Sequence, residues 1–307
     1  MKIYEYKNGF HLDGERSVAL GFFDGLHLGH RKLLECAIDS AKRLNIPSAV
    51  FTFRADSSLP KLSDAPLYSD AEKAELIAEL GIDELIVADF AALKDVSPNE
   101  FISRVLIEEL GAGVAISGKD FRFGRSAAGN TALLAEEMKK AGKEYIEIAD
   151  VSLFSSKVST TAIKKCLSEG RVGEACAMLG SPYFIRSSVT HGRGVGKTLG
   201  FPTINTDIGG RVTFLRSGVY KTEVEIDGAR YPALTNVGSC PTFGEHPLHL
   251  ETFLINFSGD LYGRTVKIYL ISFIRDERKF SSPEELVCQI ERDLEIAKAK
   301  KITLKEI

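Results

Sequence analysis

The spacing of hydrophobic residues changes between the two halves of this 307-residue chain. From residue 17 to about residue 183, short runs of β-branched and aromatic residues alternate with stretches in which apolar residues recur every three or four positions. Such alternation predicts strands and helices in turn, and hence a mostly parallel sheet covered by helices. The expected strands lie at 17–21, 48–53, 84–90, 114–118 and 144–151.

Helix start signals support this first-half pattern. Ser69 and Ser97 each stand three residues before a glutamate, which is the spacing of a capping box. Pro98 follows Ser97 directly, in the first turn, where proline is tolerated. Both serines are therefore expected to begin helices.

After about residue 184 the apolar spacing becomes two, and turn signals such as Asp227-Gly228 separate the runs. The runs are too many and too short for a parallel arrangement, so they indicate a small antiparallel barrel or sandwich. A last helix is expected from Ser282, with one apolar stripe that belongs to the core. We therefore expect two domains, 1–183 and 184–307. The second-half strands are expected at 218–226, 230–238, 249–257 and 265–274, and the stripe comprises Leu286, Ile290, Leu294 and Ala297.

Composition narrows the class of protein. Hydrophobic residues make up 44% of the chain and charged residues 26%, with a formal charge of −3, which fits a globular protein. Without a long Lys/Arg block, binding to nucleic acid is not expected. The five cysteines show no C-x-x-C spacing, which favours a reducing cytoplasm over a disulfide framework or a zinc site. No run approaches the ~18 consecutive apolar residues of a membrane span, so no membrane partner is expected.

The ten residues GFFDGLHLGH, at 21–30, stand where a strand passes into a helix. Gly25 and Gly29 would let the backbone approach phosphate oxygens, while His27 and His30 lie one helical turn apart. Such a site suits attack by an already ionised phosphate oxygen, which needs charge stabilisation and no base. Two alternatives remain: the histidines cap and pack the helix, or they bind a metal for which no third ligand is evident.

A second glycine-rich stretch, HGRGVGKTLGFPTIN, covers 191–205. Its glycines and Lys197 could bind phosphate through backbone N–H groups and charge, although the spacing is not that of a Walker motif. Thr203 and Asn205 are two residues apart, so in a strand both point the same way and their oxygens could share one Mg²⁺. The alternative is a plain connecting loop.

The first half resembles a known family at three places. GFFDGLHLGH resembles the G-x-F-D-G-x-H-x-G-H signature of nucleotidyltransferases, in the form found in bacterial bifunctional riboflavin kinase/FAD synthetases. GKDFRFG at 118–124 and VSTTAIKK at 158–165 resemble two further motifs of that family. The resemblance implies a Rossmann-like sheet that transfers AMP from ATP to FMN, giving FAD and pyrophosphate.

For this reaction the resemblance implies that His27 and His30 contact the α-phosphate and that Lys164 contacts the leaving pyrophosphate. Further ATP contacts are implied at Gly21, Phe23, Gly25, Gly29, Ser159, Thr160 and Thr161, and flavin contacts at Asp120, Phe121, Arg122 and Phe123.

The second half resembles the riboflavin kinases of the same family. HGRGVGKTLGFPTIN is similar to their G-x-G-R-x-L-G-F-P-T-A-N pattern, and matches follow at 236–244, 250–263 and 273–280. The resemblance implies a small antiparallel β-barrel, closed by the terminal helix, that phosphorylates riboflavin to FMN. It assigns Glu251 as the catalytic base and Arg275 to the flavin. Mg²⁺ is implied at Thr203 and Asn205, and ATP phosphates at Gly192, Gly194, Gly196 and Lys197.

Two departures from the family pattern leave alternatives open. Lys164 replaces the usual arginine, which keeps the charge and loses the bidentate fork. In TFRADSSLP, Asp56 and Ser57 stand where the family has proline and histidine. The alternatives to two activities are a single-activity enzyme with a slow or silent adenylyltransferase site, and a flavin-binding regulator without turnover. Asp276 and Glu277 are rival carboxylates for the role of base.

Overall fold

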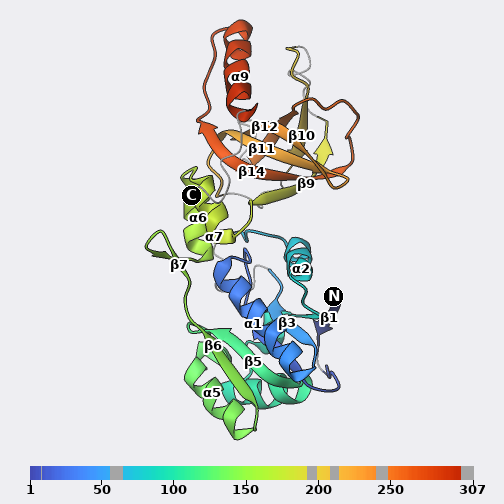
Figure 1. Cartoon of the computed structure of the whole chain (residues 1–307), viewed down its shortest axis with the longest axis vertical. Coiled ribbons are helices and arrows are strands. Elements are labelled where there is room, and N and C mark those ends of the chain that lie inside the picture. The colour runs from blue at the N-terminus through green and yellow to red at the C-terminus, as the bar shows by residue number, and fades with distance from the viewer. Residues whose placement is uncertain (8, 56–64, 192–198, 208–213, 240–247, 299–307) are drawn as a thin grey trace. The chain divides into compact units, whose positions relative to one another are not determined.

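The computed structural model describes residues 1–7, 9–55, 65–191, 199–207, 214–239 and 248–298. The chain forms two compact units, Met1–Thr160 and Thr161–Ile307. The first unit alternates strands and helices, and the second is dominated by antiparallel strands (Figure 1). The expected fold classes are therefore confirmed, while the functional boundary between residues 183 and 184 stays a prediction.

The first unit is built on a sheet of six parallel strands in the order β1-β4-β3-β2-β5-β6. Their bounds are β1 Lys2–Tyr6, β2 Arg16–Leu20, β3 Ser48–Phe53, β4 Glu84–Ala88, β5 Ala112–Gly118 and β6 Glu144–Ile148. The order places β2, whose carboxyl end leads into the histidine turn, between β3 and β5 in the middle of the sheet. Ligands of open α/β sheets collect at such strand ends.

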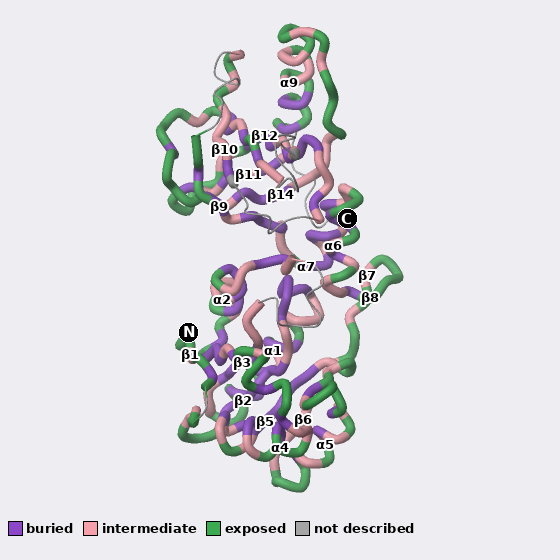
Figure 2. The backbone as a smooth tube through the Cα atoms, turned by 180° about the vertical axis from the view of Figure 1, so that it is seen from behind, coloured by how far each residue is buried: buried purple, intermediate pink, exposed green. Residues whose placement is uncertain are grey.

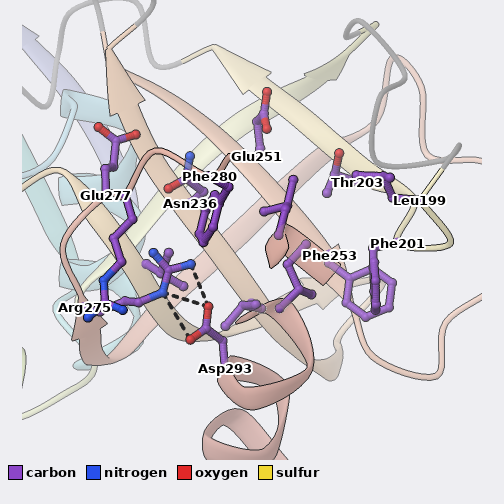
Figure 3. A pocket seen from close by; sticks show the side chains of 15 residues that line it. Leu199, Phe201, Thr203, Asn236, Glu251, Phe253, Arg275, Glu277, Phe280 and Asp293 are labelled. Carbon is purple, nitrogen blue, oxygen red and sulfur yellow. Dashed lines mark hydrogen bonds and ion pairs between the residues drawn. The ribbon is translucent and has the colours of Figure 1, made fainter. Parts of the chain in front are cut away.

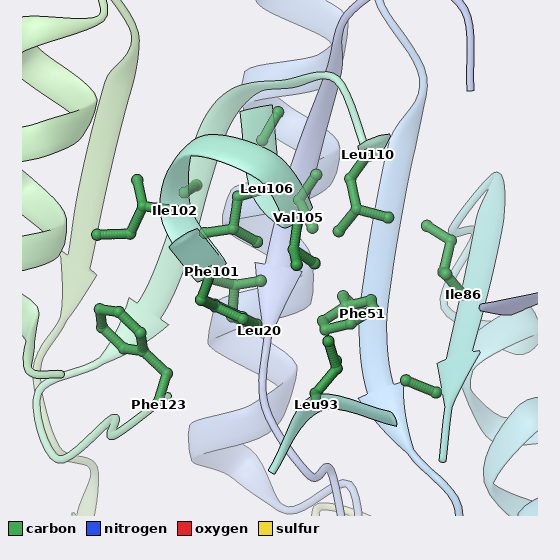
Figure 4. Close-up of a cluster of buried hydrophobic side chains, with 14 of the residues drawn as sticks. Leu20, Phe51, Ile86, Leu93, Phe101, Ile102, Val105, Leu106, Leu110 and Phe123 are labelled. Atoms are coloured by element: carbon green, nitrogen blue, oxygen red, sulfur yellow. The ribbon is translucent and has the colours of Figure 1, made fainter. Parts of the chain in front are cut away.

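Helices cover both faces of this sheet. Successive side chains along each central strand therefore enter two separate cores. On β3, Phe51 joins one core and Val50 the other. The first core, which includes Leu106 of a π-type helix, is shown in Figure 4. The helices are α1 Leu28–Leu44, α2 Asp70–Glu79, α3 Phe90–Leu93, α4 Pro98–Glu100, the π-type helix Phe101–Glu109, a 3₁₀ turn Arg125–Ala127 and α5 Thr131–Lys140.

The helix start signals are confirmed. Ser69 and Glu72 form a full capping box at α2, and the Ser97 hydroxyl accepts the backbone N–H of Glu100 at 3.3 Å. The edge strand β1 was not expected, nor was a hairpin formed by β7 Ser152–Leu153 and β8 Ser156–Lys157.

The second unit contains a closed barrel of antiparallel strands in the order β10-β13-β12-β11-β14-β9. The strands are β9 Phe184–Thr190, β10 Thr203–Asp207, β11 Gly218–Ile226, β12 Ala229–Ser239, β13 Leu248–Leu254 and β14 Thr265–Arg275. Inside the barrel the hydroxyls of Thr222, Thr235 and Thr252 form a chain of hydrogen bonds at 2.8 and 2.9 Å.

Helix α9, Pro283–Lys298, packs on the outer face of the barrel. Its buried Leu294 and Ala297 share one core cluster with Val219 and Leu234, as the stripe predicted. Leu286 and Ile290 of the same stripe are half-buried and line a cavity, so this part of the stripe is not core. Two further helices, α6 Thr160–Ser168 and α7 Val172–Leu179, precede the barrel. In Figure 2 the buried residues follow the strands of both units. In the part of the chain that the structure describes, no helix is both long and apolar enough to cross a membrane.

Candidate functional sites

The histidine turn of the first unit holds its two imidazoles face to face. His27 is the N-cap of α1, and its Nδ1 accepts the backbone N–H of His30 at 3.3 Å. The two rings stack with centroids 3.7 Å apart and planes 14° from parallel. Because Nδ1 of His27 accepts, the proton of its neutral ring belongs on Nε2, where it can be donated to a ligand.

Burial keeps both imidazoles uncharged. Desolvation lowers the pKa of His27 to about 4, and Lys157 lowers it further. The pKa of His30 lies well below its ordinary value, chiefly through desolvation, then through repulsion from His27 when that ring is protonated and from the charge of Lys73. Among the described residues, Nδ1 of His30 is buried without a hydrogen-bond partner. At neutral pH the pair therefore offers N–H dipoles rather than charges.

The backbone of the turn adopts left-handed conformations that are costly for Phe23 and Leu26 but not for glycine. Phe23, Gly25 and Leu26 have φ angles of 53°, 84° and 43°, all in the left-handed region. Glycine is favoured at Gly29 for a different reason: a Cβ there would lie 3.1 Å from the His27 ring, which is tighter than ordinary van der Waals contact. The small residue thus leaves room for the imidazole at the helix N-terminus.

Hydrogen bonds from three other segments fix this turn. The Asp24 carboxylate accepts the backbone N–H of Leu67 at 2.8 Å, and its carbonyl accepts the Thr160 hydroxyl at 2.9 Å. The Thr52 hydroxyl donates to the Phe22 carbonyl at 3.0 Å. Two motifs that are about 130 residues apart in sequence, the histidine turn and the Ser159-Thr160 segment, are therefore brought into contact.

The segment predicted to contact flavin is divided between surface and core. Asp120 and Arg122 are exposed, and Asp120 pairs with Lys157. Phe123 is 6% exposed and packs on Phe101, while Phe121 stacks on Phe123 with centroids 5.6 Å apart. A flavin role for this segment stays a prediction.

Lys164 belongs to the second unit, on α6. Its ammonium lies 5.7 Å from the centroid of the Phe214 ring. Thr161, also in the second unit, is exposed on the first turn of the same helix. The predicted phosphate roles of both residues stay predictions.

The barrel of the second unit holds a cavity of about 320 Å³ between its outer face and α9 (Figure 3). One part of its wall is apolar, with side chains from the strands and the helix. The other part carries Thr203, Asn236 and Glu251. An apolar cavity of this size with a few convergent polar groups is typical of a small-molecule site. The apolar wall comprises Leu199, Phe201, Val219, Leu234, Phe253, Phe280, Leu286 and Ile290.

Strand register explains why these polar groups converge. Glu251 on β13 stands opposite Asn205 of β10 on one side and opposite Asn236 of β12 on the other. Directly opposed residues of antiparallel strands share a face, about 5 Å apart at Cβ. Thr203, two residues before Asn205, shares that face as well. The predicted base and the two predicted metal ligands therefore lie together, with Asn236 as an unpredicted neighbour.

The rival carboxylates differ in their surroundings. Asp276 forms a two-pronged ion pair with Arg216, with both hydrogen bonds at 2.9 Å, and does not line the cavity. Glu277 does line it, and a Cβ at Gly238 would overlap its carboxylate. Thr203, Asn205, Glu251 and Asn236 form a polar row across three neighbouring strands. Glu251 lies at the centre of this row, which makes it the better-placed candidate for the base.

Arg275 reaches the cavity from the end of β14, where it pairs with Asp293 of α9 (Figure 3). Asp293 was not expected to matter, although a carboxylate within an apolar helical stripe was a readable signal. Gly192, Gly194, Gly196 and Lys197 lie outside the described residues, as do Asp56 and Ser57.

Both units match known family models. A model described as FAD synthetase matches residues 11–162, and one described as riboflavin kinase matches residues 179–301.

Similar proteins match along most of the chain. A bifunctional riboflavin kinase/FMN adenylyltransferase of Bacillus subtilis (strain 168) is 34% identical over 288 residues, covering 90% of this chain and 89% of the relative. One of Escherichia coli (strain K12) is 35% identical, covering 90% of each chain. A crystal structure described as a macrolide-efflux protein from Streptococcus pneumoniae is similar with a TM-score of 0.87 and 30% identity, covering 98% of this chain and all of that one.

Proposed function

This chain belongs to the family of bifunctional riboflavin kinase/FMN adenylyltransferases, and we propose that its second unit phosphorylates riboflavin while its first unit adenylylates the resulting FMN. ATP is the second substrate of both reactions, and FAD is the final product. The observation that carries the proposal is the pair of separate sites, one at the histidine turn and one in the barrel cavity.

In the first unit, a phosphate oxygen of FMN attacks the α-phosphorus of ATP, and pyrophosphate leaves. The nucleophile is already ionised, so no residue has to remove a proton. The neutral rings of His27 and His30 would stabilise the charge that develops on the α-phosphate by donating N–H groups. The N-terminus of α1 and the backbone N–H groups near Gly25 would support the same anion. The family resemblance assigns Lys164 to the pyrophosphate, and this role stays a prediction because Lys164 belongs to the second compact unit.

In the second unit, the primary hydroxyl of riboflavin attacks the γ-phosphorus of ATP, and ADP leaves. This hydroxyl is neutral, so the reaction gains from a base. Glu251 would take the proton, since it lies on the polar wall of the cavity. The apolar wall would hold the flavin ring, with Arg275 and Phe280 beside it.

The oxygens of the polar row fit Mg²⁺. The Thr203 hydroxyl and the Asn205 amide oxygen are hard ligands on one face of β10, and such sites commonly keep Mg²⁺ with few protein ligands plus substrate phosphates. A bound Mg²⁺ would neutralise charge on the ATP phosphates. The cytoplasmic location expected from the cysteine content stays a prediction.

Product analysis with two variants tests the assignment. The full-length chain is incubated with ATP and Mg²⁺ and with either riboflavin or FMN, and the flavins are separated. We expect the parent to form FMN and FAD from riboflavin, His30→Ala to form FMN and no FAD, and Glu251→Gln to form FAD only from supplied FMN.

Three other results would overturn parts of the proposal. The opposite pattern in the two variants would reverse the assignment of reactions to units. A parent that forms FMN and never FAD would be a single-activity enzyme, consistent with Lys164 in place of arginine. Tight flavin binding without ATP consumption would indicate a regulator without turnover.

A further inference from the structure

Helix α9 contributes a buried carboxylate to the wall of the barrel cavity. The side chain of Asp293 is 1% exposed, although its neighbours on the same helical face are Ile290, Leu294 and Ala297. Transferring a carboxylate into such surroundings is costly unless a counter-charge and hydrogen bonds compensate. A position that would suit an apolar residue is thus occupied by the carboxylate of Asp293, which must be compensated by other groups.

The compensating partner is Arg275, whose side chain is 13% exposed. Its Nε donates to the two carboxylate oxygens of Asp293 at 2.9 and 3.2 Å, and its Nη2 lies 2.8 Å from Oδ2. Gln289, one turn earlier on α9, donates to Oδ1 at 2.9 Å. The carboxylate is therefore bound by three nitrogens and has little freedom to move.

The same contacts fix Arg275 within the cavity. Its Nη1 donates to the Asp276 carbonyl at 3.0 Å, and its guanidinium carbon lies 5.8 Å from the centroid of the Phe280 ring. Arg275, Phe280 and Asp293 all line the cavity. An arginine held on both edges presents a fixed plane, whereas an unpaired one would sample several rotamers.

We propose that Asp293 is a positioning residue of the riboflavin site: its ion pair holds Arg275 and the wall of α9 in the geometry that accepts the flavin. This inference rests on the proposed function, which places the flavin in this cavity. Asp293 acts through Arg275 and has no direct part in phosphoryl transfer. Its charge should therefore affect the KM for riboflavin, not the KM for ATP.

Steady-state kinetics of the full-length chain test the proposal. Asp293→Asn keeps the size of the side chain and removes its charge, and we expect the KM for riboflavin to rise about tenfold because a charge-assisted contact is lost. The kcat and the KM for ATP should stay within about twofold, since Glu251 and the polar row are not changed. Glu291→Gln, an equivalent change on the exposed face of α9, is the matched control and should leave all three values unchanged.

A double-mutant cycle separates positioning from general loss of structure. If Asp293 acts through Arg275, then Arg275→Gln should raise the riboflavin KM by itself, and Asp293→Asn should add less than about threefold in that background. The inference is wrong if the effects of the two substitutions on the riboflavin KM multiply in the double variant. It is also wrong if Asp293→Asn leaves the riboflavin KM unchanged or raises the KM values for riboflavin and ATP equally. The rate of FAD formation from supplied FMN reports on the first unit of the same molecules.

Asp293→Glu covers the case in which Asp293→Asn fails to fold. It retains the charge, and we expect a riboflavin KM at most about threefold above that of the parent. If both variants lose FMN formation while supplied FMN is still adenylylated, Asp293 is required for folding of the barrel and the inference is wrong. If the parent itself forms no FMN, the proposed function fails instead.

Discussion

The two ring nitrogens of His27 have different roles: one caps helix α1, and the other is available to the proposed ligand. Its Nδ1 accepts the N–H of His30, as an N-cap side chain does, and this bond leaves the Nε2 proton for a ligand. The ring of His27 stacks on that of His30, and desolvation disfavours the charged form of both imidazoles. The cap and the proposed anion site would thus be the same structure, so two of the three interpretations of the motif that the sequence left open are compatible.

The lowered pKa of His27 predicts a pH-dependent stability. Its ordinary pKa of 6.5 falls to about 4 on folding, so the unfolded chain binds this proton more readily between those values. Stability is therefore full above pH 6.5 and is lost as the pH falls towards 4. From pH 7 to pH 5 this histidine should cost about 2 kcal/mol of unfolding free energy.

Urea unfolding of the parent and of His27→Gln at pH 7 and pH 5 measures this effect. The parent should lose about 2 kcal/mol more than the variant on acidification. His11→Gln, at an exposed position, is the control and should follow the parent. Equal losses in the parent and in His27→Gln would show that His27 is not held neutral by burial.

At the scale of elements, the hairpin β7–β8 is unusual for its turn. Phe154 and Ser155 have φ angles of 51° and 58°, the left-handed conformation that a two-residue hairpin requires and that glycine and asparagine adopt at least cost. The turn carries neither residue, which is why no turn signal was visible in the sequence. The hairpin leads directly into the Ser159-Thr160 segment.

Substituting glycine in this turn should relieve the strain. Ser155→Gly should raise the unfolding free energy by about 0.5–1 kcal/mol, because glycine adopts a positive φ freely. Ser156→Gly, one residue later in β8, should lower it, since glycine within a strand only gains freedom in the unfolded chain. Thermal unfolding of both variants measures the two signs, and a loss of stability in Ser155→Gly would contradict the account.

The elements that the sequence predicted share strong periodicity. The central strands and α9 carry uninterrupted apolar patterns, and most of their expected bounds lie within a few residues of those observed. Strand β1 was missed because Lys2 and Glu5 interrupt the apolar pattern of this edge strand. Asn236 was missed because its role depends on strand register, which local patterns do not encode. Asp293 was visible as a carboxylate in an apolar stripe, but its pairing with Arg275 depends on how α9 packs on the barrel.

At the scale of the whole molecule, two compact units carry two reactions that are linked by one intermediate. Each unit has its own hydrophobic core and its own polar site. FMN, which is the product of one reaction and the substrate of the other, is a small molecule that can pass through solvent. The two reactions therefore do not require both functional sites to be intact in the same molecule.

Mixing two single-site variants tests this central claim most directly. His30→Ala and Glu251→Gln are combined in equal amounts with riboflavin, ATP and Mg²⁺, and FAD is measured over time against each variant by itself. The account predicts that neither variant makes FAD from riboflavin and that the mixture does, after a lag while FMN accumulates. FAD formation by Glu251→Gln alone, or a mixture that accumulates FMN without FAD, would contradict it.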